Sequence, residues 1–197
     1  MNLLPCDGEV TYHGTVFTPE ESTRHLTQLI ADIPWEHDEI VMFGKRIVTK
    51  RMVAWYADGG RSYAYSGTKK LAHPWTEQLL SLKATAENLS GATCNCCLLN
   101  FYHDGGEGMG WHSDDERSLA ANASILSLSL GAERKFSFRH KFTKQTISVL
   151  LGNGSLLVMG GETQKYWHHQ LPKSAKVSSP RVNLTFRSLQ AWSGTVF

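Results

Sequence analysis

The sequence predicts an α+β fold, in which helices come first and an antiparallel double sheet of the jelly-roll kind follows. Two amphipathic helical segments lie in the first half of the chain, at residues 18–33 and about 74–88. After Gly91 the apolar residues change from helical spacing to alternation, and they alternate up to residue 187. Helices followed by many short strands are typical of α+β proteins, and a jelly roll is a common way to close such strands.

The first helix carries a full set of start signals. Thr18 suits the N-cap, Pro19 suits the first helical position, and Glu21 can close a capping box. Four apolar residues then follow at helical spacing: Leu26, Leu29, Ile30 and Ile33. They form one stripe, so we expect this helix to lie on a core and to end at Pro34.

Residues 39–65 read as short strands and turns. Phe43-Gly44 suggests the tip of a hairpin, and residues 58–60 suggest a second turn. Basic residues are frequent here, which is usual for a solvated face: Lys45, Arg46, Lys50, Arg51 and Arg61. The second helix, about 74–88, has its apolar residues at helical spacing.

The remaining strands are predicted from alternation. Asn100 and Tyr102 share one face of a strand, residues 126–130 and 136–138 alternate apolar and serine residues, and 156–159 is an apolar run. The last strand is 181–187, RVNLTFR. One of its faces is apolar, with Val182, Leu184 and Phe186, and the other is polar, with Arg181, Asn183, Thr185 and Arg187.

A histidine and an aspartate follow a glycine-rich turn. His112 and Asp114 are two residues apart, so an extended backbone presents both on one side. They supply two ligands of a 2-His-1-carboxylate iron(II) site, which needs one more histidine from a distant strand. The candidates are His168 and His169. Two histidines and a carboxylate also make a hydrolytic zinc site, and the residues alone leave that alternative open.

The polar face of 181–187 favours an oxygenase. A strand that turns Arg181 and Arg187 inward must face an anion, because an unpaired buried charge is costly. A dicarboxylate co-substrate suits the planar fork of arginine. The alternative for Arg187 is a surface salt bridge at a strand end.

Four motifs in order carry a resemblance: NFY at 100–102, WHSDDE at 111–116, WHHQLP at 167–172 and RVNLTFR at 181–187. Together they resemble the AlkB family of iron(II)- and 2-oxoglutarate-dependent dioxygenases, nearest to its duplex-DNA repair branch, over roughly residues 41–189. The resemblance implies a double-stranded β-helix in one domain, 1–197. Residues 1–90 would form helices and a nucleotide-recognition lid of hairpins, and residues 91–190 the core.

The resemblance also assigns residues. The family's W-x-H-x-L-P pattern selects His169 as the third iron ligand, beside His112 and Asp114, and leaves His168 outside the ligand set. It implies Fe(II), with 2-oxoglutarate and O2 as co-substrates. The positions matched to 2-oxoglutarate contacts are Asn100, Tyr102, Arg181, Thr185 and Arg187.

The implied reaction is oxidative demethylation of bases such as 1-methyladenine and 3-methylcytosine in DNA, with release of formaldehyde, succinate and CO2. A flipped base needs an aromatic face for stacking, which Tyr63 and Tyr65 would supply. Its exocyclic amine needs hydrogen-bond acceptors, which Asp115 and Glu116 would supply. A finger that fills the gap left in duplex DNA matches Phe43, Gly44 and Lys45. Backbone contacts match Lys45, Arg51, Arg139, His140 and Lys141. The branch commonly has proline where this chain has Lys50, so this segment departs from the family pattern.

Three other functions compete with DNA repair. An RNA demethylase of the same family would use the same centre on another nucleic acid. A non-catalytic β-barrel module, whose metal is structural or absent, would form no succinate. A zinc hydrolase is the weakest alternative.

Composition is that of a globular protein. The chain has 197 residues, of which 41% are hydrophobic and 19% charged, with a formal net charge of +2, so any basic surface has to be local. No secretory leader and no membrane-length apolar run are found in the sequence. We therefore expect a soluble intracellular monomer, cytoplasmic in a bacterium or nuclear in a eukaryote. Three of the four cysteines, at 94, 96 and 97, are expected to be buried free thiols.

Overall fold

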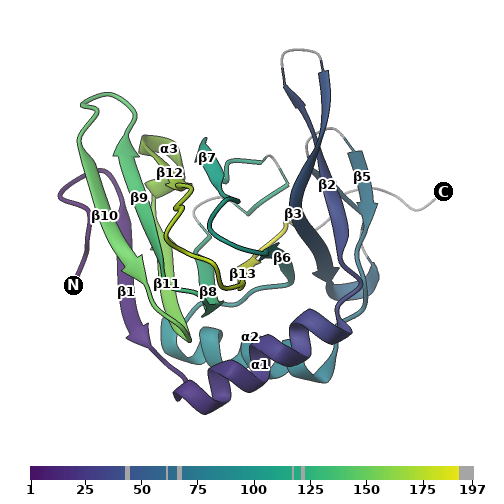
Figure 1. The fold of residues 1–197 in the computed structure, drawn as a ribbon. Coiled ribbons are helices and arrows are strands. Elements are labelled where there is room, and N and C mark those ends of the chain that lie inside the picture. The colour runs from purple at the N-terminus through teal and green to yellow at the C-terminus, as the bar shows by residue number, and fades with distance from the viewer. Residues whose placement is uncertain (43–44, 61, 66–67, 117, 121–122, 191–197) are drawn as a thin grey trace.

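The structure is a computed structural model, and it describes residues 1–42, 45–60, 62–65, 68–116, 118–120 and 123–190. Two antiparallel sheets face each other in it (Figure 1). The large sheet has seven strands in the order β1-β11-β8-β13-β6-β3-β2. Their bounds are β1 Glu9–Thr15, β2 Glu36–Met42, β3 Lys45–Ala57, β6 Cys96–Tyr102, β8 Ile125–Gly131, β11 Ser155–Gly160 and β13 Arg181–Arg187.

The small sheet has four strands in the order β10-β9-β12-β7. Their bounds are β7 Met109–His112, β9 Arg134–His140, β10 Thr146–Leu151 and β12 Trp167–Leu171. A separate hairpin pairs β4 (Ser62–Tyr65) with β5 (Thr68–Leu71). Two facing antiparallel sheets confirm the expected jelly roll, in which β7, β12 and β13 bring the predicted site residues to the space between the sheets.

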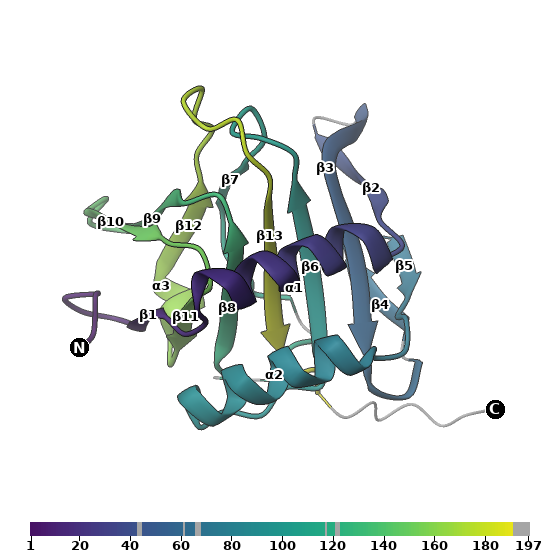
Figure 2. The same ribbon diagram turned by 60° about the horizontal axis from the view of Figure 1, so that its bottom comes forward.

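Two helices cover the outer face of the large sheet. Helix α1 (Pro19–Asp32) and helix α2 (Glu77–Ser90) lie next to each other across that face (Figure 2). Leu29 of α1 and Leu82 of α2 are fully buried in one cluster with Leu184 of β13. This packing supports β13 from behind, so its polar face points between the sheets.

The start of α1 agrees with the sequence signals. The Thr18 hydroxyl accepts a hydrogen bond from the Glu21 N–H, and the Glu21 side chain accepts one from the Thr18 N–H, which confirms the capping box. The second helix begins later than expected, because Thr76 is its N-cap and Pro74 precedes the cap. It ends at Ser90, and its C-cap is Gly91, whose φ of 72° favours glycine.

The N-terminal strand was not predicted. Strand β1 pairs with β11 at the edge of the large sheet, and β3 pairs with β6 in its interior. The first 90 residues therefore supply strands as well as helices to the layer that holds the site. All four cysteines are free, and those at 94, 96 and 97 are buried, as expected. Within the described ranges, no helix is both long and apolar enough to cross a bilayer.

Candidate active site

The three predicted metal ligands meet between the sheets. Strands β7 and β12 pair so that His112 lies opposite His169, with ring centroids 4.2 Å apart. Asp114 follows β7 and turns back toward both rings. Its Oδ1 lies 3.9 Å from His112 Nε2, and its Oδ2 lies 4.0 Å from His169 Nε2. One ligand atom from each residue falls within 4.8 Å of the others, which suits a shared ion.

Hydrogen bonds hold the ligands in this arrangement. His112 Nδ1 lies 2.8 Å from the Gly110 carbonyl oxygen, which can only accept, so Nδ1 carries the hydrogen. The lone pair is then on Nε2, the atom that faces Asp114. The Asp114 N–H donates to Gln164 Oε1 at 2.9 Å, and the Ser113 hydroxyl donates to the Trp167 carbonyl at 3.0 Å. These bonds fix the segment after β7 against β12 and the residues just before it.

The electrostatics favour a cation at this point. Burial alone would raise the pKa of Asp114, but Arg187 and the two histidines hold that pKa below its ordinary value. Burial lowers the pKa of His169 to about 3, so its imidazole is neutral. A carboxylate and neutral imidazoles are the protonation states that an iron(II) site requires. The residues present therefore fit the ion.

The choice between the neighbouring histidines follows from the alternation of β12. His169 is buried and points between the sheets with Trp167 and Leu171. His168 lies on the outward side and is half-buried. Burial and the charges of Lys141, Arg139 and Lys144 lower its pKa.

A polar pocket adjoins the three ligands. It is lined by all five residues expected to contact 2-oxoglutarate: Asn100, Tyr102, Arg181, Thr185 and Arg187. Asn183 lines it too, and the alternation of 181–187 had placed it on this face without a role. Asn183 Nδ2 donates to Ser127 Oγ and to the Leu128 carbonyl, both at 2.9 Å, so it fastens β13 to β8.

Arg181 is a buried cation at one end of this pocket. It is 2% exposed, its Nη2 donates to Ser129 Oγ at 2.9 Å, and its guanidinium lies 5.5 Å from the Tyr102 ring centroid. Among the residues that the structure describes, no carboxylate pairs with it. Burial lowers its pKa to about 10, so it remains charged at neutral pH. Such a charge suits an anionic ligand.

Arg187 lies at the other end, beside the metal ligands. Its Nη2 is 2.9 Å from Asp114 Oδ2 and its Nη1 is 3.4 Å from Glu116 Oε1. The side chain is 4% exposed, so the surface salt bridge at a strand end is excluded. Arg187 also lines the polar pocket, whose volume is about 40 Å³.

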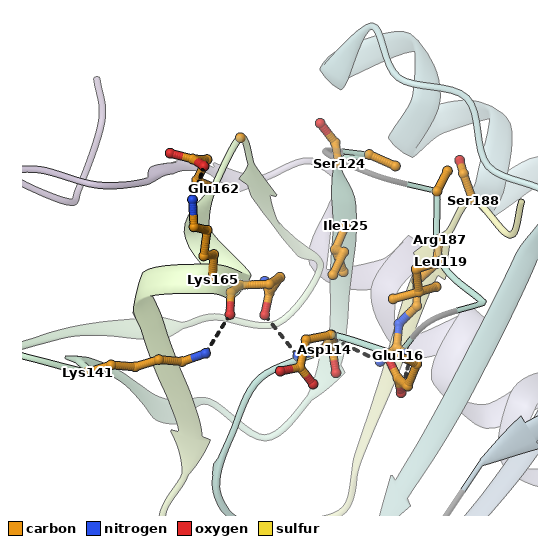
Figure 3. Close-up of a pocket in the computed structure, with 15 residues that line it drawn as sticks. Asp114, Glu116, Leu119, Ser124, Ile125, Lys141, Glu162, Lys165, Arg187 and Ser188 are labelled. Carbon is orange, nitrogen blue, oxygen red and sulfur yellow. Dashed lines mark hydrogen bonds and ion pairs between the residues drawn. The ribbon is translucent and has the colours of Figure 1, made fainter.

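A larger cavity lies on the other side of Asp114. Its volume is about 420 Å³, and Asp114, Glu116 and Lys141 line it (Figure 3). Asp115 lines it as well. Asp115 is exposed, whereas Glu116 is half-buried beside Arg187. The acidic pair therefore lies close to the metal ligands.

Two expected nucleic-acid contacts are wrong. Arg51 is 4% exposed; its Nη2 is 2.5 Å from Asp38 Oδ2, and its Nη1 donates to Asn100 Oδ1. Its guanidinium supports Asn100 of the polar pocket, and its burial leaves it little access to a phosphate on the surface. His140 is 3% exposed and bonded inside the fold. Both were read as surface residues because a basic run carries no signal for burial.

Five of the expected substrate residues have no described side chain. Phe43 and Gly44 lie outside the described residues, and so do the side chains of Lys45, Tyr63 and Tyr65. Strands β2 and β3 pair on either side of the Phe43-Gly44 position, and Tyr63 and Tyr65 are alternate residues of β4.

Comparisons with known proteins agree with this geometry. The family model described as the 2OG-Fe(II) oxygenase superfamily matches residues 9–187. The chain belongs to this superfamily. As a member, it uses Fe(II), with 2-oxoglutarate and O2 as co-substrates.

Named relatives place it in the AlkB family of that superfamily. The chain is 40% identical to mouse "DNA oxidative demethylase ALKBH2" across 94% of this chain and 80% of that protein. It is 38% identical to mouse "Alpha-ketoglutarate-dependent dioxygenase alkB homolog 3" across 86% of this chain, but it spans only 62% of that relative. The structure titled "The structure of OsALKBH1" has a TM-score of 0.61 at 15% identity, covering 94% of this chain and 99% of that one, which supports the fold.

Proposed function

We propose that this AlkB-family oxygenase is a DNA-repair enzyme that removes methyl groups from base nitrogens, as in 1-methyladenine and 3-methylcytosine. The observation that carries the proposal is the convergence of His112, Asp114 and His169 beside a pocket with a buried cation, Arg181. The relatives that share most of the chain are named for DNA demethylation or as alkB homologues, which supports DNA as the substrate.

In this proposal His112, Asp114 and His169 hold the iron. When bound, the ion supplies the oxidation of 2-oxoglutarate to succinate and CO2 and the hydroxylation of the substrate methyl group, which then leaves as formaldehyde. Arg181 binds the distal carboxylate of 2-oxoglutarate by a charge-assisted pair. Arg187 orients Asp114 and binds the metal-proximal end of the diacid. Asn100, Tyr102 and Thr185 complete the pocket.

Substrate contacts follow from the other cavity. Asp115 and Glu116 accept hydrogen bonds from the exocyclic amine of the base and offset the positive charge of an N-methylated ring. Tyr63 and Tyr65 provide a stacking face on β4. Phe43, with Gly44 and Lys45, acts as the finger that fills a duplex after base extrusion, so duplex DNA is the preferred form.

The test is a single-turnover assay. The protein is loaded with Fe(II) and 2-oxoglutarate without oxygen, then given oxygen with a methylated duplex, a methylated single strand or a methylated RNA. Demethylation and succinate are followed together. Equal amounts of demethylated base and succinate on DNA support the proposal. Faster turnover of RNA than of either DNA form supports the RNA demethylase instead, and no succinate under any condition supports a non-catalytic module.

Phe43→Ala tests the duplex preference in the same assay. It should slow turnover of the duplex and leave that of the single strand unchanged. An equal rate on both substrates before and after the substitution would remove the finger from the proposal while leaving the chemistry intact.

A further inference from the structure

The turn between β9 and β10 carries an aromatic ring in water. Phe142 is 74% exposed, and of the large hydrophobic side chains that the structure describes only Met1 is more exposed. Lys141 and Lys144 flank it in the same turn. A single exposed aromatic ring is common on protein surfaces and does not by itself indicate a binding site. The neighbouring residues are therefore needed to argue one.

Hydrogen bonds to the buried His140 side chain order this turn. The N–H groups of Phe142 and Thr143 donate to His140 Nδ1 at 3.3 and 3.0 Å. Because Nδ1 accepts, Nε2 carries the hydrogen and donates to Asp7 Oδ2 at 3.2 Å. The group of Cys6, Asp7 and His140, whose ligand atoms lie within 4.8 Å, is thus explained without a metal. An aromatic ring on an ordered turn loses little conformational entropy when it binds a partner.

Positive charge continues from the turn along the outer side of the small sheet. Arg139 and His168 are paired neighbours on β9 and β12, and the charges of Arg139, Lys141 and Lys144 all act on His168. The Arg139 guanidinium lies 4.3 Å from the centre of the Trp111 ring, on β7 beside the metal ligand His112. Aromatic and cationic groups therefore alternate from β7 to the turn.

This surface is continuous with the active site. Lys141 lines the same cavity of about 420 Å³ as Asp114 and Asp115 (Figure 3). Its Nζ donates to the Gln164 carbonyl oxygen at 2.8 Å, which is a neutral acceptor. A strand whose target base lies beside Asp114 would pass Lys141 before it reached Phe142.

We propose that the outer surface formed by Trp111, Arg139, Lys141, Phe142 and Lys144 binds the strand next to the target nucleotide when the DNA substrate is single-stranded. Phe142 stacks on one base, and the cations contact phosphates. Aromatic rings interleaved with positive charge are the general means of holding single-stranded nucleic acid without reading its sequence. The inference rests on the proposed function, and it adds a base contact where the sequence had suggested backbone contacts alone.

Binding of single strands to the full chain tests this surface, without oxygen so that no turnover occurs. Phe142→Ser should weaken binding of a strand long enough to reach the turn by about tenfold, and should leave a short strand that covers only the site unchanged. Phe142→Tyr should bind like the parent. Leu150→Ser is the matched control, since Leu150 is also exposed, at 56%, but lies toward the far end of the same hairpin.

Three outcomes would overturn the proposal. If a long strand with abasic flanks bound as tightly as the same strand with bases, stacking on Phe142 would be excluded. Arg139→Gln and Lys144→Gln should each reduce the salt dependence of binding by roughly 0.7 in the log–log slope, and an unchanged slope would exclude the phosphate contacts. If Phe142→Ser weakened the binding of duplex DNA as much as that of a single strand, this surface would bind paired DNA instead.

The assay also separates this inference from the proposed function. Suppose that the protein demethylates no substrate but Phe142→Ser still weakens its binding of single strands. That result would reject the proposed activity and support the binding surface. Normal demethylation of long single strands by Phe142→Ser, with normal binding, would reject the surface alone.

Discussion

Arg187 and Asp114 are in direct contact, with 2.9 Å between Nη2 and Oδ2. The sequence had placed one at the end of the 2-oxoglutarate strand and the other among the metal ligands. Their contact joins the two halves of the site, because the same guanidinium that holds the carboxylate also lines the polar pocket. Metal affinity and co-substrate affinity should therefore depend on one residue.

Arg187→Leu should weaken Fe(II) binding by about tenfold to a hundredfold, the usual effect of removing a group that orients a metal ligand. The reason is that Asp114 would lose the charge that keeps it ionised and oriented. Titration of the apoprotein with Fe(II), or with Co(II) followed by absorbance, measures this. Arg24→Leu on the exposed face of α1 is the control, and equal affinities in the two variants would contradict the prediction.

Arg181→Leu should raise the 2-oxoglutarate concentration needed for half-maximal succinate formation by about tenfold to a hundredfold, because a charge-assisted pair contributes roughly 1.5–3 kcal/mol. The maximal rate at saturating 2-oxoglutarate should change less. Arg181→Lys keeps the positive charge but loses the planar guanidinium that binds a carboxylate through two hydrogen bonds. Its half-maximal 2-oxoglutarate concentration should therefore lie between those of the parent and the leucine variant. An unchanged requirement in the leucine variant would remove Arg181 from the pocket.

His169→Ala should abolish both Co(II) binding and turnover, because His169 Nε2 is one of three atoms that converge on the ion. His168→Ala should keep most of both, since that ring points away from the space between the sheets. The two variants differ by one position on the same strand, so each is the other's control. The reverse pattern would show that the register assigned through residues 167–171 is wrong.

Most of the site could be predicted because strand alternation reports which side chains share a face. Val182, Leu184 and Phe186 are fully buried under the helices, and the opposite residues of β13 line the polar pocket. The pairing of His112 with His169 needed more than alternation, because it depends on how β7 and β12 meet. Only the resemblance to a family supplied that long-range information.

The remaining features depend on tertiary contacts that leave no local pattern. Strand β1 has an irregular pairing with β11 that shifts near Gly14, and its sequence shows no clean alternation. Gln164, which holds Asp114 in place, lies on the four-residue helix α3 (Thr163–Tyr166), too short for a helical period to be visible. Arg51 looked like part of a solvated basic run because its partner, Asp38, belongs to the neighbouring strand β2.

The buried pair of Arg51 and Asp38 leads to the last prediction. Both side chains are at most 4% exposed, and Arg51 also donates to Asn100 of the polar pocket. Arg51→Met should lower the free energy of unfolding by about 3–5 kcal/mol, because it leaves a buried carboxylate without its partner. The double variant Arg51→Met with Asp38→Leu should recover a large part of that loss. Chemical denaturation of the three proteins measures both effects. If Arg51 instead contacted DNA from the surface, Arg51→Met would keep the parent stability and lose only salt-dependent affinity.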